Sequence, residues 1–251
     1  MTFKVVIPAR YASTRLPGKP LLDIRGKPMV VWVVESACAS NADEVWVATD
    51  DDRIGNAVDR VTSKAKSMIT SVDHRSGTDR IAEVATRNGW ADDIIVVNVQ
   101  GDEPQMPVML INQVAALLQA NPHAQIATLC TPIVSLEEFL NTNVVKVVKA
   151  DNDVALYFSR APIPWHRDSA SSLNSQTRFD GASRHLGIYA YRVGALRRMT
   201  QLQPGTLEMA ESLEQLRAMQ AGMQIVVAQA SVQPGQSVDT PEDIERVRTS
   251  T

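Results

Sequence analysis

The sequence predicts an α/β protein in which a mostly parallel sheet lies between helices and carries an inserted antiparallel lobe. Two patterns predict this class. Through the first half of the chain, short apolar segments rich in β-branched residues alternate with longer segments of helical periodicity. Between about 132 and 204, two neighbouring strand-like segments and a polar loop replace that alternation. The βαβα order favours parallel strands joined by helical crossovers, and the interruption predicts the lobe.

The elements of the first half are predicted one by one. Pro28 suits the first position of a helix. The acidic run at 50–52 can cap a helix, and the segment 76–79 places an acidic residue where the next helix dipole favours it. The run 94–99 is almost continuously apolar, which is typical of a strand covered on both faces. The expected elements are strands at 4–9, 44–49, 94–99 and 126–132, and helices at 29–40, about 52–60, from 77 onward and 108–119.

The second half is predicted in the same way. The segments 144–148 and 154–159 flank an Asp-Asn-Asp run, which predicts a hairpin with an Asx-rich turn. A polar loop at 165–184 follows. Further elements are expected as a strand at 185–191, a helix at about 207–220, a strand at 224–230 and a last helix. Because no linker is visible, we expect one domain over 1–251, with its core at about 1–131 and 205–251 and its lobe at about 132–204.

Charge and composition exclude several function classes. The chain carries 28 acidic and 25 basic residues, a net charge of -3, so no global attraction draws it to nucleic acid or to an anionic membrane. Its apolar runs fall far short of the roughly 20 residues that a membrane span needs. Its two cysteines, Cys38 and Cys130, are far apart in apolar stretches, as in a reducing compartment. We expect a cytoplasmic protein without nucleic-acid or membrane partners.

The loop after the first strand carries three cations among small residues. Arg10, Arg15 and Lys19 follow Pro8 and are separated mainly by Ala, Ser, Thr and Gly. Small residues let backbone N–H groups approach a ligand, and the cations supply charge for polyanionic oxygens. Open α/β sheets bind ligands at this end of their strands. The loop matches neither GxxxxGK[ST] nor GxGxxG, so the residues alone leave a phosphate site and a solvated basic loop as equal alternatives.

Two aspartates stand where a metal ion can be held. Asp102 lies just beyond a predicted buried strand, where a carboxylate can hold Mg²⁺ against substrate phosphates or can cap a turn. The segment 240–243 is a helix start close to a capping box, and this explains its residues without any function. Asp239, one residue earlier, is left unexplained and is available as a second metal ligand.

The predicted strand at 185–191 has two different faces. Its period of two puts His185, Gly187, Tyr189 and Tyr191 on one face and apolar residues on the other. The polar face is typical either of a sheet that bounds a cleft or of one that faces solvent.

The predicted helix at 207–220 also has polar residues beside its apolar ones. Glu214 and Gln215 flank the apolar stripe, and they either reach into a site or lie on a solvated helix face. The stripe consists of Met209, Leu213, Leu216 and Met219.

Seven stretches, taken in order and nearly from end to end, carry a resemblance to a known family. They are IPARYASTRLPGKPL at 7–21, HRSGTDR at 74–80, VNVQGDEP at 97–104, ALYFSRAPIPW at 155–165, RHLGIYAYR at 184–192, LEQLR at 213–217 and VDTPED at 238–243. With them the chain resembles the CMP-KDO synthetases, which are 3-deoxy-manno-octulosonate (KDO) cytidylyltransferases. The resemblance implies a Rossmann-like nucleotidyltransferase fold and the transfer of CMP from CTP to KDO, with release of pyrophosphate, for lipopolysaccharide synthesis. It also implies a Mg²⁺ cofactor and a homodimer formed through the lobe.

The resemblance further implies roles for individual residues. Arg10, Ser13, Arg15 and Lys19 would hold the triphosphate, with Arg10 and Lys19 nearest the reacting phosphates. Ser76, Gln100 and the backbone near Pro8 and Ala9 would contact the cytosine, and Asp102 and Asp239 would hold Mg²⁺. Arg160, His185, Tyr189, Glu214 and Gln215 would line the sugar site. Because the sugar is acidic it needs a fixed cation, and Arg160 is a suitable bidentate partner for its carboxylate.

Two alternatives to this function stay open from the sequence. One is a cytidylyltransferase for a different acidic sugar, such as sialic acid or an 8-amino analogue of KDO. The other is a nucleotide-binding regulatory protein that keeps the basic loop without turnover. The presence of both Asp102 and Asp239 argues against the second alternative.

Overall fold

The computed structural model describes residues 2–12, 16–167, 179–235 and 237–249, and its fold is of the α/β class that the sequence predicts. The strands of the main sheet are β1 (Lys4–Ala9), β4 (Glu44–Thr49), β5 (Ala65–Ile69), β6 (Ile95–Asn98), β7 (Ile126–Pro132), β8 (Lys146–Lys149), β9 (Ala155–Ser159), β10 (Ser183–Arg192) and β11 (Ile225–Gln229). A separate pair consists of β2 (Asp23–Ile24) and β3 (Lys27–Pro28).

The helices alternate with these strands through most of the chain. They are the 3-10 turn η1 (Lys19–Leu21), α1 (Met29–Ala39), α2 (Asp52–Val58), α3 (Gly77–Arg87), α4 (Val108–Ala120), α5 (Leu136–Leu140), α6 (Val193–Gln201), α7 (Thr206–Glu211), α8 (Gln215–Gln220) and α9 (Pro241–Thr249).

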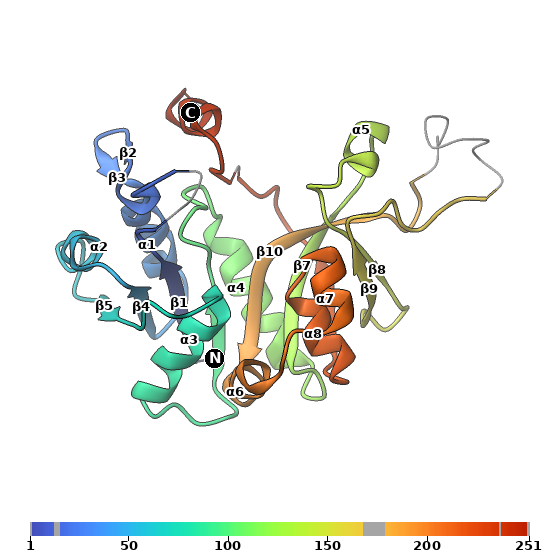
Figure 1. The fold of residues 1–251 in the computed structure, drawn as a ribbon, viewed down its shortest axis with the longest axis horizontal. Helices are drawn as coiled ribbons and strands as arrows, with labels where there is room; N and C mark the ends of the chain where they lie inside the picture. The colour runs from blue at the N-terminus through green and yellow to red at the C-terminus, as the bar shows by residue number, and fades with distance from the viewer. Residues whose placement is uncertain (1, 13–15, 168–178, 236, 250–251) are drawn as a thin grey trace.

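The main sheet is parallel except around one long strand. Its order is β11-β7-β10-β6-β1-β4-β5, and the hairpin of β8 and β9 is attached through β10. Strands β5, β4, β1 and β6 run parallel to one another, and β7 runs parallel to β11. Strand β10 runs antiparallel to both β6 and β7, and in Figure 1 it curves from the sheet toward the lobe. The predicted parallel sheet with an antiparallel insertion is therefore confirmed.

Alternation along the strands sends neighbouring side chains into two helical layers. Val5 and Ile7 of β1 belong to the cluster that contains the buried faces of α1, α2 and α4. Val6, which lies between them, belongs to the cluster that contains α3, α6 and α8. Figure 1 shows α3, α6 and α8 in front of the sheet and α4 behind it. Both faces of the sheet are covered, which explains the almost continuous apolar runs of its strands.

The amino end of α3 is fixed by its own side chains. The hydroxyl of Ser76 accepts a hydrogen bond from the backbone N–H of Asp79 at 3.1 Å, and the Asp79 carboxylate accepts one from the backbone N–H of Ser76 at 3.1 Å. This reciprocal pair is a capping box. It holds the start of α3 at the carboxyl edge of the sheet, beside the end of β1.

The carboxyl-terminal segment packs against residues near the start of the chain. Val238, Ile244 and Val247 pack with Ile24 of β2 and Met29 of α1 in a separate apolar cluster. In Figure 1, helix α9 accordingly lies above the ends of the first strands. The segment before α9 is thereby placed at the same sheet edge as the loop that follows β1.

The structure differs from the sequence predictions in several details. Within the range 132–204 predicted for the lobe, β10 lies between β6 and β7 of the main sheet, and α6 packs in the same apolar cluster as α3 and α8. The helix predicted at 207–220 is two helices, because Ser212 takes a left-handed backbone conformation with φ 52° and ends α7. As a consequence Met209 is 64% exposed rather than part of an apolar stripe. Strand β5, with its mixed sequence AKSMI, was not predicted.

Within the described ranges, no helix combines the length and the apolar character that crossing a membrane requires.

Candidate active site

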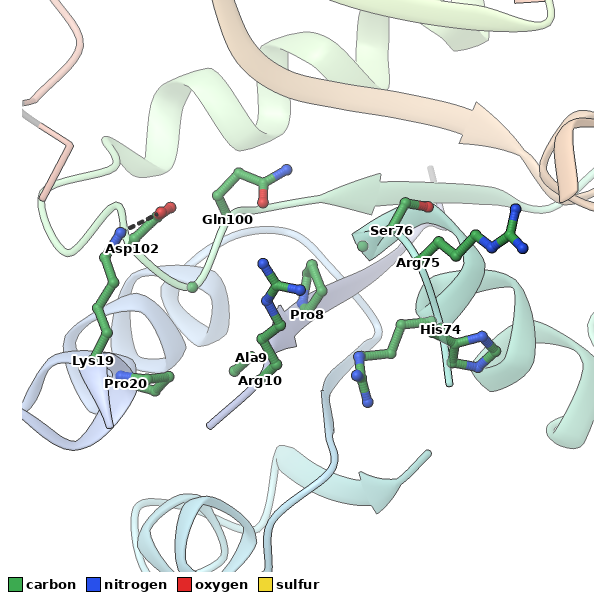
Figure 2. Close-up of a pocket in the computed structure, with 13 residues that line it drawn as sticks. Pro8, Ala9, Arg10, Lys19, Pro20, His74, Arg75, Ser76, Gln100 and Asp102 are labelled. Atoms are coloured by element: carbon green, nitrogen blue, oxygen red, sulfur yellow. Dashed lines mark hydrogen bonds and ion pairs between the residues drawn. The ribbon is translucent and has the colours of Figure 1, made fainter. Parts of the chain in front are cut away.

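A pocket of about 270 Å³ lies at the carboxyl ends of β1 and β6 and at the amino end of α3. This is the edge at which open α/β sheets bind ligands. Figure 2 shows Lys19 and Asp102 on one side of the pocket, Ser76 and Arg75 on the other, and Arg10 between them. The predicted residues that line it are Pro8, Ala9, Arg10, Lys19, Ser76, Gln100 and Asp102. His74, Arg75 and Arg80 line it as well and were not predicted.

The floor of the pocket depends on the close approach of two backbone segments. A Cβ atom added at Gly101 would lie 2.9 Å from the backbone oxygen of Pro8 and 3.4 Å from the Cβ of Ala9. Gly101 does not have a positive φ. Glycine is therefore needed here because the loops after β1 and β6 touch, and not because the backbone adopts a left-handed conformation.

Replacing Gly101 by alanine is expected to lower the free energy of unfolding by about 1–3 kcal/mol, because a backbone oxygen cannot move aside as a side chain can. Urea unfolding of the two proteins measures the difference. Gly55→Ala is the matched control, since its added Cβ would meet the hydroxyl of Ser67 at 3.1 Å, and that side chain can rotate. Equal stability of Gly101→Ala and the wild-type protein would contradict the close approach.

Lys19 joins the two aspartates that the sequence singles out. Its Nζ lies 2.7 Å from Oδ2 of Asp102 and 3.4 Å from Oδ1 of Asp239. The backbone N–H of Val238 donates to the backbone oxygen of Asp102 at 2.9 Å, which brings the carboxyl-terminal segment to the loop after β6. Residues more than 200 positions apart in sequence thus meet at the rim of the pocket.

This carboxylate pair fits a divalent cation. Asp102 and Asp239 both reach one ammonium group, so both can reach one cation at that place. Among the residues that the structure describes, no group of three or more His, Cys, Asp or Glu side chains forms a metal site. Mg²⁺ is usually held by one or two carboxylates together with substrate phosphates and water, so two carboxylates suffice for it.

The helix start after Asp239 matches its predicted pattern. The Asp243 carboxylate accepts hydrogen bonds from the backbone N–H groups of Thr240 at 2.8 Å and of Asp239 at 2.9 Å. The hydroxyl of Thr240 accepts one from the N–H of Asp243 at 3.3 Å. The side chains of Thr240 and Asp243 thus form the hydrogen bonds that cap the helix, whereas the side chain of Asp239 is directed to Lys19.

The buried side chain of Arg80 supports the loop that follows β1. Arg80 is 3% exposed, and its guanidinium donates to the hydroxyl of Thr70 at 2.5 Å and to the carboxylate of Asp50 at 3.2 Å. Asp50 also accepts a hydrogen bond from the backbone N–H of Tyr11 at 2.9 Å. The network ties α3 to the loop after β1. The stretch HRSGTDR carried the signal for Arg80, because it lies in one of the motifs behind the family resemblance.

A second, smaller pocket of about 90 Å³ adjoins the first and shares Gly77 and Gln100 with it. Its other lining residues are Thr78, Asn98, Tyr189, Tyr191, Glu214 and Gln215. Three of the five residues predicted for the sugar site, Tyr189, Glu214 and Gln215, are therefore brought together here. The face of β10 with Tyr189 and Tyr191 is buried against this pocket and is not solvent-exposed.

Glu214 is held at the junction of α3 and α8. Its Oε2 accepts a hydrogen bond from the hydroxyl of Thr78 at 2.8 Å. Burial raises the pKa of the Glu214 carboxyl, and the hydrogen bonds from Thr78 and Ser76 act in the opposite direction. The carboxylate thus connects the capping residue of α3 to the wall of the second pocket.

Two predicted sugar-site residues do not line either pocket. Arg160 donates from Nε to the backbone oxygen of Glu211 on α7 at 2.7 Å and from Nη1 to that of Thr142 in the lobe at 2.9 Å. His185 lies behind Tyr189, with the two ring centroids 5.1 Å apart, and its Nε2 is 3.0 Å from the hydroxyl of Thr128. Two predicted triphosphate residues, Ser13 and Arg15, lie outside the described residues.

Glu103 was not predicted and lies partly buried beside the site. Burial raises the pKa of its carboxyl to about 7, and the neighbouring charge of Asp102 adds to this effect. Its Oε1 would be 3.5 Å from a Cβ atom placed at Gly187 on β10. The burial comes from packing against a strand more than 80 residues later in the chain, and no local pattern in the sequence reveals it.

The burial of the His185 imidazole predicts how the free energy of unfolding depends on pH. Burial lowers the pKa of His185 to about 3, whereas an exposed histidine titrates near 6.5. Between these values the unfolded chain binds a proton that the folded chain does not. The stabilising contribution is therefore complete above about pH 6.5 and is lost as the pH falls, by at most about 1.4 kcal/mol per pH unit.

His185→Gln is expected to flatten this decline, as measured by urea unfolding from about pH 7 to about pH 4.5. His123→Gln, at an exposed position, is the control. Glu103 titrates with the opposite sign over part of this range, because its folded pKa is raised. The two variants are therefore compared with the wild-type protein at each pH. A slope that His185→Gln leaves unchanged would show that the imidazole is not buried in its neutral form.

Fold and site together define the class of protein. A sheet edge with cations, a carboxylate pair and two adjoining pockets is an arrangement typical of nucleotide-binding α/β proteins. A family model described as cytidylyltransferase matches residues 4–225. A solved structure of 4-diphosphocytidyl-2C-methyl-D-erythritol synthase, 11% identical, shares the fold with a TM-score of 0.65, and the match covers 98% of this chain and 97% of that chain.

Closer relatives narrow the class to one family. The chain is 53% identical over 247 residues to the 3-deoxy-manno-octulosonate cytidylyltransferase of Thioalkalivibrio sulfidiphilus, which covers 98% of each protein. It is 55% identical over 251 residues to that of Alcanivorax borkumensis, covering 99% of this chain and 98% of the relative. A solved structure of CMP:2-keto-3-deoxy-manno-octonic acid synthetase complexed with CTP matches with a TM-score of 0.88 at 44% identity, over 98% of this chain and 96% of that chain. The chain belongs to the 3-deoxy-manno-octulosonate cytidylyltransferase family.

Proposed function

We propose that this protein transfers CMP from CTP to KDO, with release of pyrophosphate, in lipopolysaccharide synthesis. One observation carries the proposal: a cationic pocket and a smaller pocket lined by hydroxyl, amide and carboxyl groups adjoin at Gly77 and Gln100. A transferase for two different substrates needs such a pair of neighbouring sites, with the reacting atoms near their junction. The names of the close relatives support CTP and KDO as those substrates.

CTP occupies the larger pocket in this proposal. Arg10 and Lys19 hold the triphosphate, together with Ser13 and Arg15. The carboxamide of Gln100 and the hydroxyl of Ser76 contact the cytosine, along with the backbone at 8–9, and all of these residues line the pocket. Carboxamide and hydroxyl groups both donate and accept hydrogen bonds, as recognition of a neutral base requires.

The reaction is a displacement at the α-phosphorus. The anomeric hydroxyl oxygen of KDO forms a bond to the α-phosphorus, the bond from that phosphorus to the bridging oxygen breaks, and pyrophosphate leaves with the electron pair. The hydroxyl proton passes to water. Because both reactants are anions, the protein acts mainly by positioning them and by neutralising charge. Arg10 and Lys19 stabilise the charge that develops on the leaving pyrophosphate.

Asp102 and Asp239 are the residues that would hold Mg²⁺. When bound, the ion supplies positive charge that polarises a phosphoryl oxygen and offsets the repulsion between the two substrates. With the ion in place, the carboxylates no longer need the ammonium of Lys19. That group is then available for the phosphate oxygens of the neighbouring pocket.

KDO occupies the smaller pocket, against Tyr189, Glu214 and Gln215. His185 packs against the ring of Tyr189 and holds it in place. Arg160 remains the proposed partner of the sugar carboxylate, and it would have to exchange its present backbone carbonyl partners for that carboxylate. Arginine suits the exchange, because its planar guanidinium binds carboxylates in a bidentate manner.

We also propose a cytoplasmic homodimer that is formed through the lobe. Val134, Leu156 and Trp165 are large apolar side chains of the lobe that are exposed in the single chain, and exposed apolar groups often mark an interface. Cys38 and Cys130 are both free, which agrees with a reducing compartment. Analytical ultracentrifugation measures the association, and a monomer at micromolar concentration would contradict it.

A pyrophosphate-release assay tests the function. The four nucleoside triphosphates are each combined with KDO, 8-amino-KDO and sialic acid, with and without Mg²⁺. Release that needs CTP, KDO and Mg²⁺ together is the expected result. Preference for sialic acid would assign the protein to another acidic sugar, and no release with any of these sugar acids would leave nucleotide binding without turnover.

A further inference from the structure

Two buried polar atoms have no hydrogen-bond partner among the residues that the structure describes. They are the side-chain oxygen Oδ1 of Asn98 and the side-chain nitrogen Nε2 of Gln215. Asn98 is 2% exposed and Gln215 is 7% exposed, and both line the smaller pocket. Leaving a buried donor or acceptor unpaired is costly, so native proteins rarely do so without a reason. A partner for these two atoms is expected from outside the chain.

Folding does not explain an asparagine at position 98. It is the last residue of β6 and is paired with Val6 on one side and with Tyr189 on the other, in the middle of the sheet. Val96, two residues earlier on the same face, belongs to an apolar cluster. A β-branched or aromatic residue suits such a position better than asparagine does. The asparagine therefore points to a ligand.

The two orphan atoms together specify the chemical group that would satisfy them. Oδ1 of Asn98 needs a donor, and Nε2 of Gln215 needs an acceptor. A carboxylate only accepts and an ammonium group only donates, so neither satisfies both atoms. A neutral hydroxyl donates one hydrogen bond and accepts two, so it is a kind of group that meets both requirements. The pocket wall is thus suited to a hydroxyl group rather than to the charged end of a ligand.

We propose that Asn98 is a specificity-determining residue of the acceptor-sugar pocket. Together with Gln215, it forms hydrogen bonds with one neutral hydroxyl group of the sugar. This inference rests on the proposed function, because it takes the occupant of the smaller pocket to be the sugar. The pocket adjoins the nucleotide pocket at Gly77 and Gln100, so a hydroxyl bound here orients the ring relative to the nucleotide. A water molecule held between the same two atoms is the competing occupant, and the experiment separates the two.

Asn98→Leu tests the proposal, because leucine keeps the branched shape and removes both polar atoms. The KM for the sugar is expected to rise about tenfold, whereas the KM for CTP changes less than about twofold. The melting temperature of the free protein is expected to stay the same or to rise, because the substitution removes a buried hydrogen-bond acceptor that has no partner. A residue with a merely structural role would lower the melting temperature instead.

Asn88→Leu is the matched control. The Asn88 amide is paired, since its Nδ2 donates to the backbone oxygen of Val84 at 3.0 Å at the end of α3. Its replacement is expected to lower the melting temperature and to leave both KM values unchanged. The two asparagines are thereby predicted to respond in opposite ways.

Sugar analogues that each lack one hydroxyl complete the test. One analogue is expected to bind the wild-type protein about tenfold more weakly and to lose nothing further with Asn98→Leu. An unchanged KM for KDO in Asn98→Leu, or losses that multiply for every analogue, would overturn the inference while wild-type turnover upholds the proposed function. Absence of wild-type turnover would overturn both.

Discussion

Replacing Asp102 by asparagine is expected to abolish turnover, with kcat lower by about 1,000-fold, while the Kd for CTP rises less than about tenfold. The change keeps the shape of the side chain and removes its charge. One of two carboxylates would then be missing from the proposed Mg²⁺ site, whereas Arg10 and Lys19 would still hold the triphosphate. Pyrophosphate release measures kcat, and isothermal titration measures CTP binding.

Asp93→Asn is the control for this change. Asp93 is exposed and precedes the amino end of β6, whereas Asp102 follows the carboxyl end, so the same chemical change is made at the opposite edge of the sheet. Its kinetics should match those of the wild-type protein. If Asp102→Asn kept a near-normal rate at saturating Mg²⁺, the assignment of Asp102 as a metal ligand would be wrong.

The parts of the fold with strong local patterns are predictable from the sequence. The segment 44–49 forms β4 with the predicted bounds, and 126–132 forms β7. The capping residues at 76–79 start α3 where they were expected. In these segments propensity, periodicity and capping agree with the tertiary structure, which is why the predictions succeed.

The failures have a different physical origin. The sequence pattern at 207–220 predicts one helix, but the left-handed conformation of Ser212 divides it into two. Such a conformation is usually found at a glycine, and there is none at this position. Glu103 and Asn98 both lie beside β10, which comes more than 80 residues later in the chain, so no local pattern reveals their surroundings. The sequence pattern predicts that Asn98 is part of a strand. Its polar side chain is explained only by the pocket that it lines in the structure.

The site itself was partly predictable. Lys19 and Asp102 lie in the loops that follow two predicted strands, and the parallel topology brings the carboxyl ends of those strands to one edge of the sheet. Asp239 was singled out because it precedes a helix start whose other residues are explained by capping. The family resemblance supplied the remaining roles, of which those of Arg160 and His185 concern residues that line neither pocket in this structure. Side chains that have to change partners to meet a substrate cannot be located from a sequence pattern.

Lys19→Met is expected to lower kcat by about 100- to 1,000-fold and to raise the KM for CTP about tenfold, because a cation that is proposed to hold the triphosphate is removed. The same change is expected to lower the Mg²⁺ concentration needed for half-maximal activity. Lys19 contacts both Asp102 and Asp239, at 2.7 and 3.4 Å, and so would compete with the proposed metal ion for them. Without the ammonium group, the two carboxylates repel each other and attract a divalent cation more strongly.

The opposite signs of these two effects make the prediction specific. Lys66→Met is the control, since Lys66 is exposed and its ammonium group lies over the ring of Trp46 at 5.2 Å, on β4 and β5. It should change neither the rate nor the Mg²⁺ requirement. Both carboxylates contacted by Lys19 are partly exposed, so Lys19→Met should cost no more than about 1 kcal/mol of stability, and reduced activity would not reflect unfolding. If the Mg²⁺ requirement rose together with the loss of rate, Lys19 would support the metal site rather than occupy its position.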